Sequence, residues 1–152
     1  MKKLFVFDLD FTLWNTGGVW VDCTYPPYSV KNGEIIDSGG NRMKLYPDSL
    51  EILTLLRNEN RIIAVASRTN EPSWAKDLIQ LMNIGHFFDY MEIYPSSKIN
   101  HLSRISKKSG IPFSEMVFFD DEHRNIRDAE SIGIEAVYVK NGLQLRMVKK
   151  FL

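Results

Sequence analysis

The sequence predicts an α/β protein of the Rossmann-like, doubly wound type, with a mostly parallel five-stranded sheet and helices on both faces. Short apolar runs alternate along the chain with segments of helical periodicity, which is the pattern of such a sheet. Side chains capable of chemistry follow four of these runs directly, where ligands gather in open parallel sheets. The 152 residues, 44% of them apolar, suffice for one domain at 1–152. Residues 15–45 are predicted to form a small β-hairpin flap, and no cap domain is expected.

The first predicted strand, residues 4–7, is a continuous apolar run, which is typical of a strand buried on both faces. Asp8 and Asp10 follow it and point to the same side if the chain stays extended. Two like charges placed in this way repel unless a cation lies between them, and oxygen ligands favour Mg²⁺. Asp8 is therefore a candidate metal ligand and nucleophile, and Asp10 a candidate donor and acceptor of protons. The alternative is that both residues only shape a turn or cap a helix.

An irregular segment rich in Gly, Pro and Asn follows Trp14 and extends to Tyr46. Its Asn32-Gly33 step predicts a hairpin between residues 28–31 and 34–37. We expect a two-stranded flap, because the segment is too short and too broken to carry a core of its own. Four aromatic residues either fasten this flap to the domain, which we favour, or line a site: Trp14, Trp20, Tyr25 and Tyr28.

The rest of the chain alternates between helices and strands. Apolar residues at helical spacing, Pro near helix starts and Gly after helix ends set the boundaries. Helices are predicted at 47–60, 71–82, 96–108 and 123–132, strands at 62–66, 87–94, 116–119 and 136–139, and a last helix near residue 152. Right-handed crossovers then bring the carboxyl ends of all strands to one edge of the sheet.

Further polar side chains follow the second, third and fourth strands at this edge, namely Ser67, Lys98 and the pair Asp120-Asp121. A phosphoryl group suits them, because Lys98 is a cation for a phosphate oxygen and Ser67 is a hydroxyl donor. Asp120 and Asp121 would complete the oxygen shell of Mg²⁺. Each residue alone has a structural alternative: Ser67 can cap a turn, Lys98 can be a solvated helix residue, and the acidic pair can cap a helix. Four coincident strand ends favour a site.

The composition excludes several partners. Lys+Arg and Asp+Glu number 19 each, so the formal net charge is zero, whereas a nucleic-acid-binding surface is normally basic. No apolar run approaches the roughly 20 residues that cross a bilayer, and Asp8 interrupts an apolar start that imitates a signal peptide. Cys23 is the one cysteine, so no internal disulfide can form, which fits a cytoplasmic protein.

The three histidines are interpreted as surface or cap residues: His86, His101 and His123.

The stretch Asp8-Leu9-Asp10-Phe11-Thr12 resembles the DxDxT nucleophile motif of the haloacid dehalogenase superfamily. Ser67, Lys98 and the Asp120-Asp121 pair resemble its second, third and fourth motifs, in the expected order. More narrowly, the chain is similar to the magnesium-dependent phosphatase family in four segments, at 7–14, 66–69, 92–98 and 117–125. Residues 15–19 depart from the family's pattern, because the flap holds extra residues there.

The resemblance implies a role for each motif residue. It implies Asp8 as nucleophile and metal ligand, and Asp10 as a general acid/base that binds the metal through its backbone carbonyl. It implies Ser67 and Lys98 as phosphate ligands and Arg68 as a second substrate contact. The second acid of the motif also favours a phosphatase over a dehalogenase, because a dehalogenase has no alkoxide to protonate.

The resemblance also ranks the two acids of the fourth motif. Asn125 aligns with the trailing acid of that motif, which makes Asp121 the expected metal ligand. Asp120 then occupies a position where many relatives have Gly.

The predicted function is a Mg²⁺-dependent phosphomonoester hydrolase that works through an aspartyl-phosphate on Asp8. Without a cap, the site is expected to admit a phosphorylated small molecule or a phosphoprotein, including sugar phosphates and phosphotyrosine. The alternatives are a receiver-like phospho-acceptor module and a phosphotransferase. In receiver domains the Lys follows the last strand, whereas Lys98 precedes the strand that ends in Asp120, so the order disfavours that module. No nucleic-acid or membrane partner is expected, and the sequence indicates no particular oligomeric state.

Overall fold

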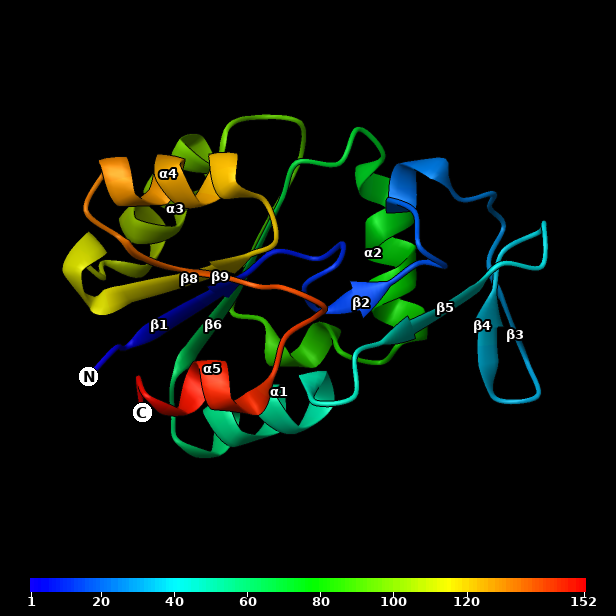
Figure 1. Ribbon diagram of the computed structural model, residues 1–152, viewed down its shortest axis with the longest axis horizontal. Helices are drawn as coiled ribbons and strands as arrows, with labels where there is room; N and C mark the ends of the chain where they lie inside the picture. The colour runs from blue at the N-terminus through cyan, green and yellow to red at the C-terminus, as the bar shows by residue number, and fades with distance from the viewer.

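The computed structural model describes residues 1–152 and contains a central five-stranded sheet (Figure 1). Its strands lie in the order β7-β6-β1-β8-β9, and every pairing between them is parallel. The strands are β1 (Leu4–Phe7), β6 (Ile62–Ser67), β7 (Tyr90–Ile93), β8 (Met116–Asp120) and β9 (Glu135–Tyr138). The predicted parallel α/β sheet is confirmed.

Helices cover both faces of this sheet. The helices are α1 (Ser49–Asn58), α2 (Pro72–Leu81), α3 (Lys98–Ser109), α4 (His123–Ser131) and α5 (Leu145–Lys149). In Figure 1, α3 and α4 lie above the sheet, whereas α1 and α5 lie below it. Alternate residues of β1 enter two separate cores, because Phe5 and Phe7 pack with α1, α2 and α5, and Leu4 and Val6 pack with α3 and α4.

β1 lies at the centre of the sheet because its sequence is apolar on both sides. All four of its residues are completely buried, and it pairs with β6 on one side and β8 on the other. Phe7, the last residue of β1, lies opposite Val65 and Phe119, so the chain after β1 and the last residues of β6 and β8 reach the same edge of the sheet. Asp8, Ser67 and Asp120 are therefore brought together by parallel pairing alone.

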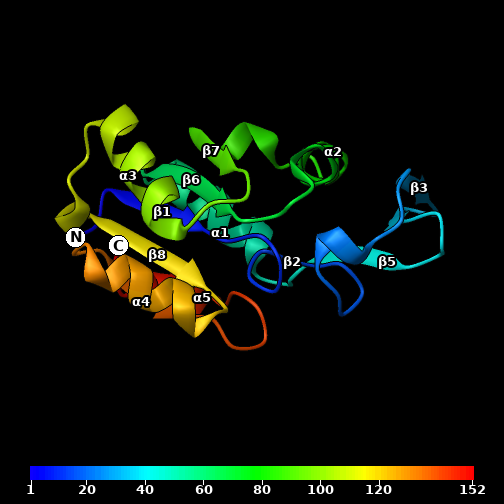
Figure 2. The ribbon, with the colours of Figure 1, turned by 90° about the horizontal axis from the view of Figure 1, so that it is seen from above.

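The flap is more extensive than predicted. The expected hairpin forms between β3 (Ser29–Lys31) and β4 (Glu34–Ile36), with positive φ angles of 54° at Asn32 and 77° at Gly33. Two further strands, β5 (Arg42–Leu45) and β2 (Trp14–Asn15), extend it to a four-stranded antiparallel sheet in the order β2-β5-β4-β3. In Figure 2, β2 lies nearest the central sheet and β3 at the far end of the flap. The two-stranded expectation was incomplete because both strands are short: β2 has two residues, and β5 alternates polar and apolar residues over only four.

Two further expectations need correction. The strand predicted at 87–94 begins only at Tyr90, because residues Gly85–Phe87 form a short 3-10 turn, η2. His101 is completely buried instead of lying at the surface, since it shares the inner face of α3 with Lys98, Leu102 and Ile105. None of the helices has the length and apolar character needed to cross a membrane.

Candidate active site

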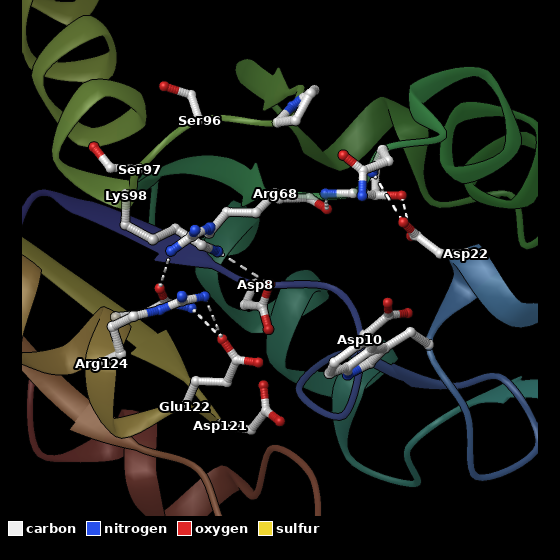
Figure 3. A pocket seen from close by; sticks show the side chains of 16 residues that line it. Asp8, Asp10, Asp22, Arg68, Ser96, Ser97, Lys98, Asp121, Glu122 and Arg124 are labelled. Carbon is white, nitrogen blue, oxygen red and sulfur yellow. Dashed lines mark hydrogen bonds and ion pairs between the residues drawn. The ribbon is translucent and has the colours of Figure 1, made fainter.

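A pocket opens at the carboxyl edge of the central sheet, and Figure 3 shows the side chains that line it. Six of the seven predicted catalytic, phosphate-binding and metal-binding residues line this pocket: Asp8, Asp10, Ser67, Arg68, Lys98 and Asp121. Asp120 does not line it, because its side chain is completely buried beneath the others.

Lys98 is the first residue of α3, and its ammonium group is buried among the acids. Its Nζ donates to Asp8 Oδ1 at 3.0 Å and to the Ala66 carbonyl at 2.5 Å, and lies 3.1 Å from Asp120 Oδ2. Burial alone would lower the pKa of Lys98, but the two carboxylates outweigh it and raise the pKa above its ordinary value. Lys98 therefore stays charged at neutral pH and holds Asp8 in place.

Asp8, Asp120 and Asp121 form a cluster of carboxylates. One oxygen from each lies within 4.8 Å of the others. Burial, and next the charge of Asp120, raise the pKa of Asp8 well above its ordinary value, while burial above all raises the pKa of Asp121 to about 6. One ammonium group does not balance three carboxylates, so the cluster keeps a net negative charge that a bound cation would neutralise. The oxygen-only donor set fits Mg²⁺.

The two neighbouring acids of this cluster have different environments. Asp120 Oδ1 accepts from the Glu122 amide at 2.9 Å, and its Oδ2 accepts from Asn125 Nδ2 at 3.1 Å. With Lys98 also beside it, Asp120 has its acceptor sites engaged by protein donors. No ammonium or guanidinium group bonds Asp121, which lines the pocket. The geometry therefore favours Asp121 over Asp120 as a ligand to a metal in the pocket.

Asp10 lies in the tight turn after β1 with both carboxylate oxygens bonded. Trp14 Nε1 donates to its Oδ1 at 2.7 Å, and the Val21 amide donates to its Oδ2 at 3.0 Å. Both bonds lower its pKa, yet burial outweighs them and raises the pKa to about 6. Such a carboxyl group can give up and take back a proton near neutral pH, as a general acid and base must.

Ser67 and Arg68 reach the pocket from the end of β6. The Ser67 hydroxyl oxygen accepts from the Thr69 amide at 3.3 Å, so its own proton is available to a ligand. Arg68 Nη1 donates to Asn125 Oδ1 at 3.2 Å, which connects the end of β6 to the first turn of α4. The sequence-predicted side chains are thus gathered from four strand ends.

The sequence reasoning missed Asp22, which lies in the 3-10 turn η1 (Val21–Cys23) of the flap. Its carboxylate accepts from the Thr69 hydroxyl and from the Asn70 amide, the latter at 3.0 Å. Asp22 thereby fastens the flap to the loop that follows Ser67. Its partners lie 47 and 48 residues away, so no local pattern could have indicated the contact.

The aromatic residues of the flap divide between the two roles considered for them. Trp14 is completely buried and anchors Asp10, whereas Trp20 is 56% exposed and lines the pocket. Tyr25 is exposed away from the pocket. Fastening the flap is therefore the role of Trp14, and Trp20 lies at the site.

Comparison with known proteins gives matches along the whole chain. Residues 1–152 match a family described as Acid Phosphatase. Human Magnesium-dependent phosphatase 1 is 41% identical over 152 residues, covering 99% of this chain and 85% of the human protein. A HAD-like hydrolase superfamily protein of Schizosaccharomyces pombe is 41% identical over 145 residues, covering 87% of this chain and 82% of that protein.

Solved structures share the fold at lower sequence identity. A haloacid dehalogenase-like hydrolase from Streptococcus pneumoniae has a TM-score of 0.68 at 14% identity, covering 97% of this chain and 90% of its own. The N-terminal part of a Bacteroides fragilis protein, which contains a phosphatase domain and was solved with Mg, has a TM-score of 0.65 at 21% identity. That match covers 90% of this chain and 35% of the other chain.

Proposed function

Because the chain belongs to the acid phosphatase family and is a magnesium-dependent phosphatase of the haloacid dehalogenase superfamily, we propose that it hydrolyses phosphomonoesters through an aspartyl-phosphate on Asp8. The observation that carries this proposal is the buried Lys98 ammonium, bonded to Asp8 at the floor of a pocket that Asp10 and Ser67 also line. A cation is needed there to neutralise phosphoryl oxygens beside a carboxylate nucleophile.

The proposed metal ligands are the carboxylates of Asp8 and Asp121 together with the backbone carbonyl of Asp10. When bound, Mg²⁺ supplies positive charge that neutralises the phosphoryl oxygens and offsets the repulsion among the carboxylates. Asp120 instead contacts Lys98 and is bonded by Asn125, so its proposed role is to position the Lys98 ammonium group.

In the proposed first step, an Asp8 carboxylate oxygen attacks phosphorus and the bond from phosphorus to the leaving oxygen breaks. Asp10 gives its proton to that oxygen, and the alcohol departs. In the second step Asp10 takes a proton from water, whose oxygen attacks phosphorus, so that the bond to Asp8 breaks and phosphate leaves. In both steps the Ser67 hydroxyl holds a phosphoryl oxygen, and Lys98 does so by releasing one of the three acceptors that its N–H groups engage. Arg68 makes a second contact to the substrate.

The proposed substrates are phosphorylated small molecules or phosphoprotein side chains. The insertion after β1 folds as the small flap sheet and leaves the pocket without a cap, which supports access for bulky substrates. We propose that residues 1–152 act as one domain, with the flap as one wall of its site. A cytoplasmic location is also proposed, because the single cysteine, Cys23, is an exposed free thiol.

The test compares wild-type protein with Asp8→Asn and Asp10→Asn variants on p-nitrophenyl phosphate, with Mg²⁺ and with chelator. Asp8→Asn should abolish turnover, and chelator should do the same to the wild type. Asp10→Asn should accumulate a phosphoenzyme, detected as an increase in the intact mass. The double variant, Asp8→Asn with Asp10→Asn, should show no such increase. Glu130→Gln, an exposed residue of α4, is the matched control. Turnover retained by Asp8→Asn would refute the nucleophile, and a long-lived phosphoenzyme in the wild type would favour the receiver-like alternative.

A further inference from the structure

Two arginines, Arg68 and Arg124, line the same pocket as Lys98. The three cations differ in depth, because the Lys98 side chain is 1% exposed, Arg68 is half-buried and the Arg124 side chain is 60% exposed. Lys98 therefore lies at the floor, beside the proposed nucleophile, and the arginines lie toward the rim. The part of the substrate that contacts the two arginines is therefore different from the part that contacts Lys98.

Arg68 has a charge that no carboxylate balances. None of the ion pairs of the structure includes it, and its Nη1 donates to the neutral Asn125 Oδ1 at 3.2 Å. A guanidinium group has five N–H donors, and this bond uses one of them. The remaining donors suit bidentate bonding to a carboxylate or a phosphate.

Arg124 has an acidic neighbour but only a weak one. Its Nη2 lies 3.6 Å from Glu122 Oε2, and both side chains are substantially exposed, so the pair contributes little. Asn125 Nδ2 donates to the same Glu122 oxygen at 3.1 Å. Glu122 therefore keeps a partner when Arg124 turns to a ligand.

Asn125 bonds Arg68 to α4, the helix that also carries Arg124. It is 2% exposed and bonds Asp120, Glu122 and Arg68 with its side chain. Figure 3 shows Arg68 and Arg124 on the Lys98 side, with Asp10 and Asp22 on the opposite side. The two guanidinium groups thus approach one region from the residue that follows β6 and from the first turn of α4.

Resting on the proposed function, we propose that Arg68 and Arg124 form a second anion-binding subsite, which selects phosphomonoesters whose leaving group carries a carboxylate or a second phosphate. Lys98 meets the phosphoryl group that is transferred, and the arginines meet the other anionic group. Both classes present the paired oxygens that guanidinium groups recognise.

Two matched substrate pairs test this subsite. 3-Phosphoglycerate and glycerol 3-phosphate differ by a carboxylate in place of a hydroxymethyl group, and fructose 1,6-bisphosphate adds a phosphate to fructose 6-phosphate. In the wild type with Mg²⁺, kcat/KM should be about tenfold higher for the substrate that carries the extra anionic group, in at least one of the two pairs. A tenfold ratio is the contribution expected of about one charge-assisted hydrogen bond. Arg68→Gln and Arg124→Gln should each reduce this ratio toward one.

Arg127→Gln is the matched control, because Arg127 is exposed on the same helix and does not line the pocket. It should keep the wild-type ratio. The pair that shows the preference identifies the anionic group. Wild-type ratios near one, or ratios that neither arginine substitution changes, would overturn the subsite. Turnover of p-nitrophenyl phosphate in the same preparation would still support the proposed function. Absence of turnover on every phosphomonoester would overturn both.

Discussion

Replacing Lys98 with Met should destabilise the metal-free protein strongly, since the Lys98 ammonium has three acceptors and its side chain is 1% exposed. The substitution leaves Asp8 and Asp120 buried without a counter-ion. Breaking a buried ion pair by removing one partner costs about 3–5 kcal/mol. The Ala66 carbonyl also loses its side-chain donor, so we expect a loss near the upper end of that range, about 5 kcal/mol.

The loss should depend on pH and on metal. Burial and the charge of Asp120 already raise the pKa of Asp8, and removal of Lys98 takes away the main opposing effect. A carboxyl group whose pKa is raised on folding destabilises the protein once it is ionised, so its cost grows from about pH 4 upward. The variant should therefore recover stability relative to wild type at pH 5, and Mg²⁺ should restore part of it at pH 7.5.

Urea unfolding, followed by tryptophan fluorescence with chelator and with Mg²⁺, measures both effects. Lys107→Met is the matched control, because Lys107 is exposed on the same helix, and it should change the free energy of unfolding by less than about 0.5 kcal/mol. The reasoning is refuted if Lys98→Met unfolds at the same urea concentration as the control in chelator, or if Mg²⁺ stabilises the two variants equally.

Three further predictions concern pH and the flap. Because the pKa of Asp10 is raised to about 6, kcat/KM for glycerol 3-phosphate should fall above that pH as the proton donor is lost, and pH–rate profiles should show a smaller fall for p-nitrophenyl phosphate, whose leaving group needs no proton. Burial lowers the pKa of His101 to about 4, so His101 alone should lower the free energy of unfolding by up to about 3 kcal/mol as pH drops from 6.5 to 4, whereas Asp8, Asp10 and Asp121, whose pKa values are raised, contribute in the opposite direction; urea titrations of wild type and His101→Gln should therefore differ by this amount across the range. Asp22→Asn and Thr69→Val should each lower kcat/KM about tenfold, and a double-mutant cycle should show that their effects do not add. Additive effects would show that the two side chains act independently.

The sequence was sufficient for the central sheet because its strands are short apolar runs and its catalytic candidates follow those runs directly. Asp8 comes one residue after β1, and Ser67 is the last residue of β6. Once parallel pairing is assumed, their proximity needs no information about side-chain packing. The same logic placed Lys98 at the edge, since it begins the helix after β7.

What the sequence could not provide depends on contacts between distant residues or on very short elements. The bond from Thr69 to Asp22 joins residues 47 positions apart. β2 has two residues, too few to show alternation, although Trp14 within it anchors Asp10. His101 was misplaced because α3 is polar in composition, and only the helical phase set by Leu102 and Ile105 identifies its inner face.

The acidic pair after β8 shows how one step along the chain can separate two roles. Asp120 is the last residue of the strand and is buried among Lys98, Asn125 and the Glu122 amide, whereas Asp121 lies past the strand end and reaches the pocket. Consecutive residues of an extended chain point to opposite sides, so the two carboxylates cannot have the same surroundings. A carboxylate saturated by protein donors is a poor metal ligand but a good partner for a buried ammonium group. The doubled acid thus supplies one group that can position Lys98 and another that can bind Mg²⁺, which a single acid at this strand end could not do at once.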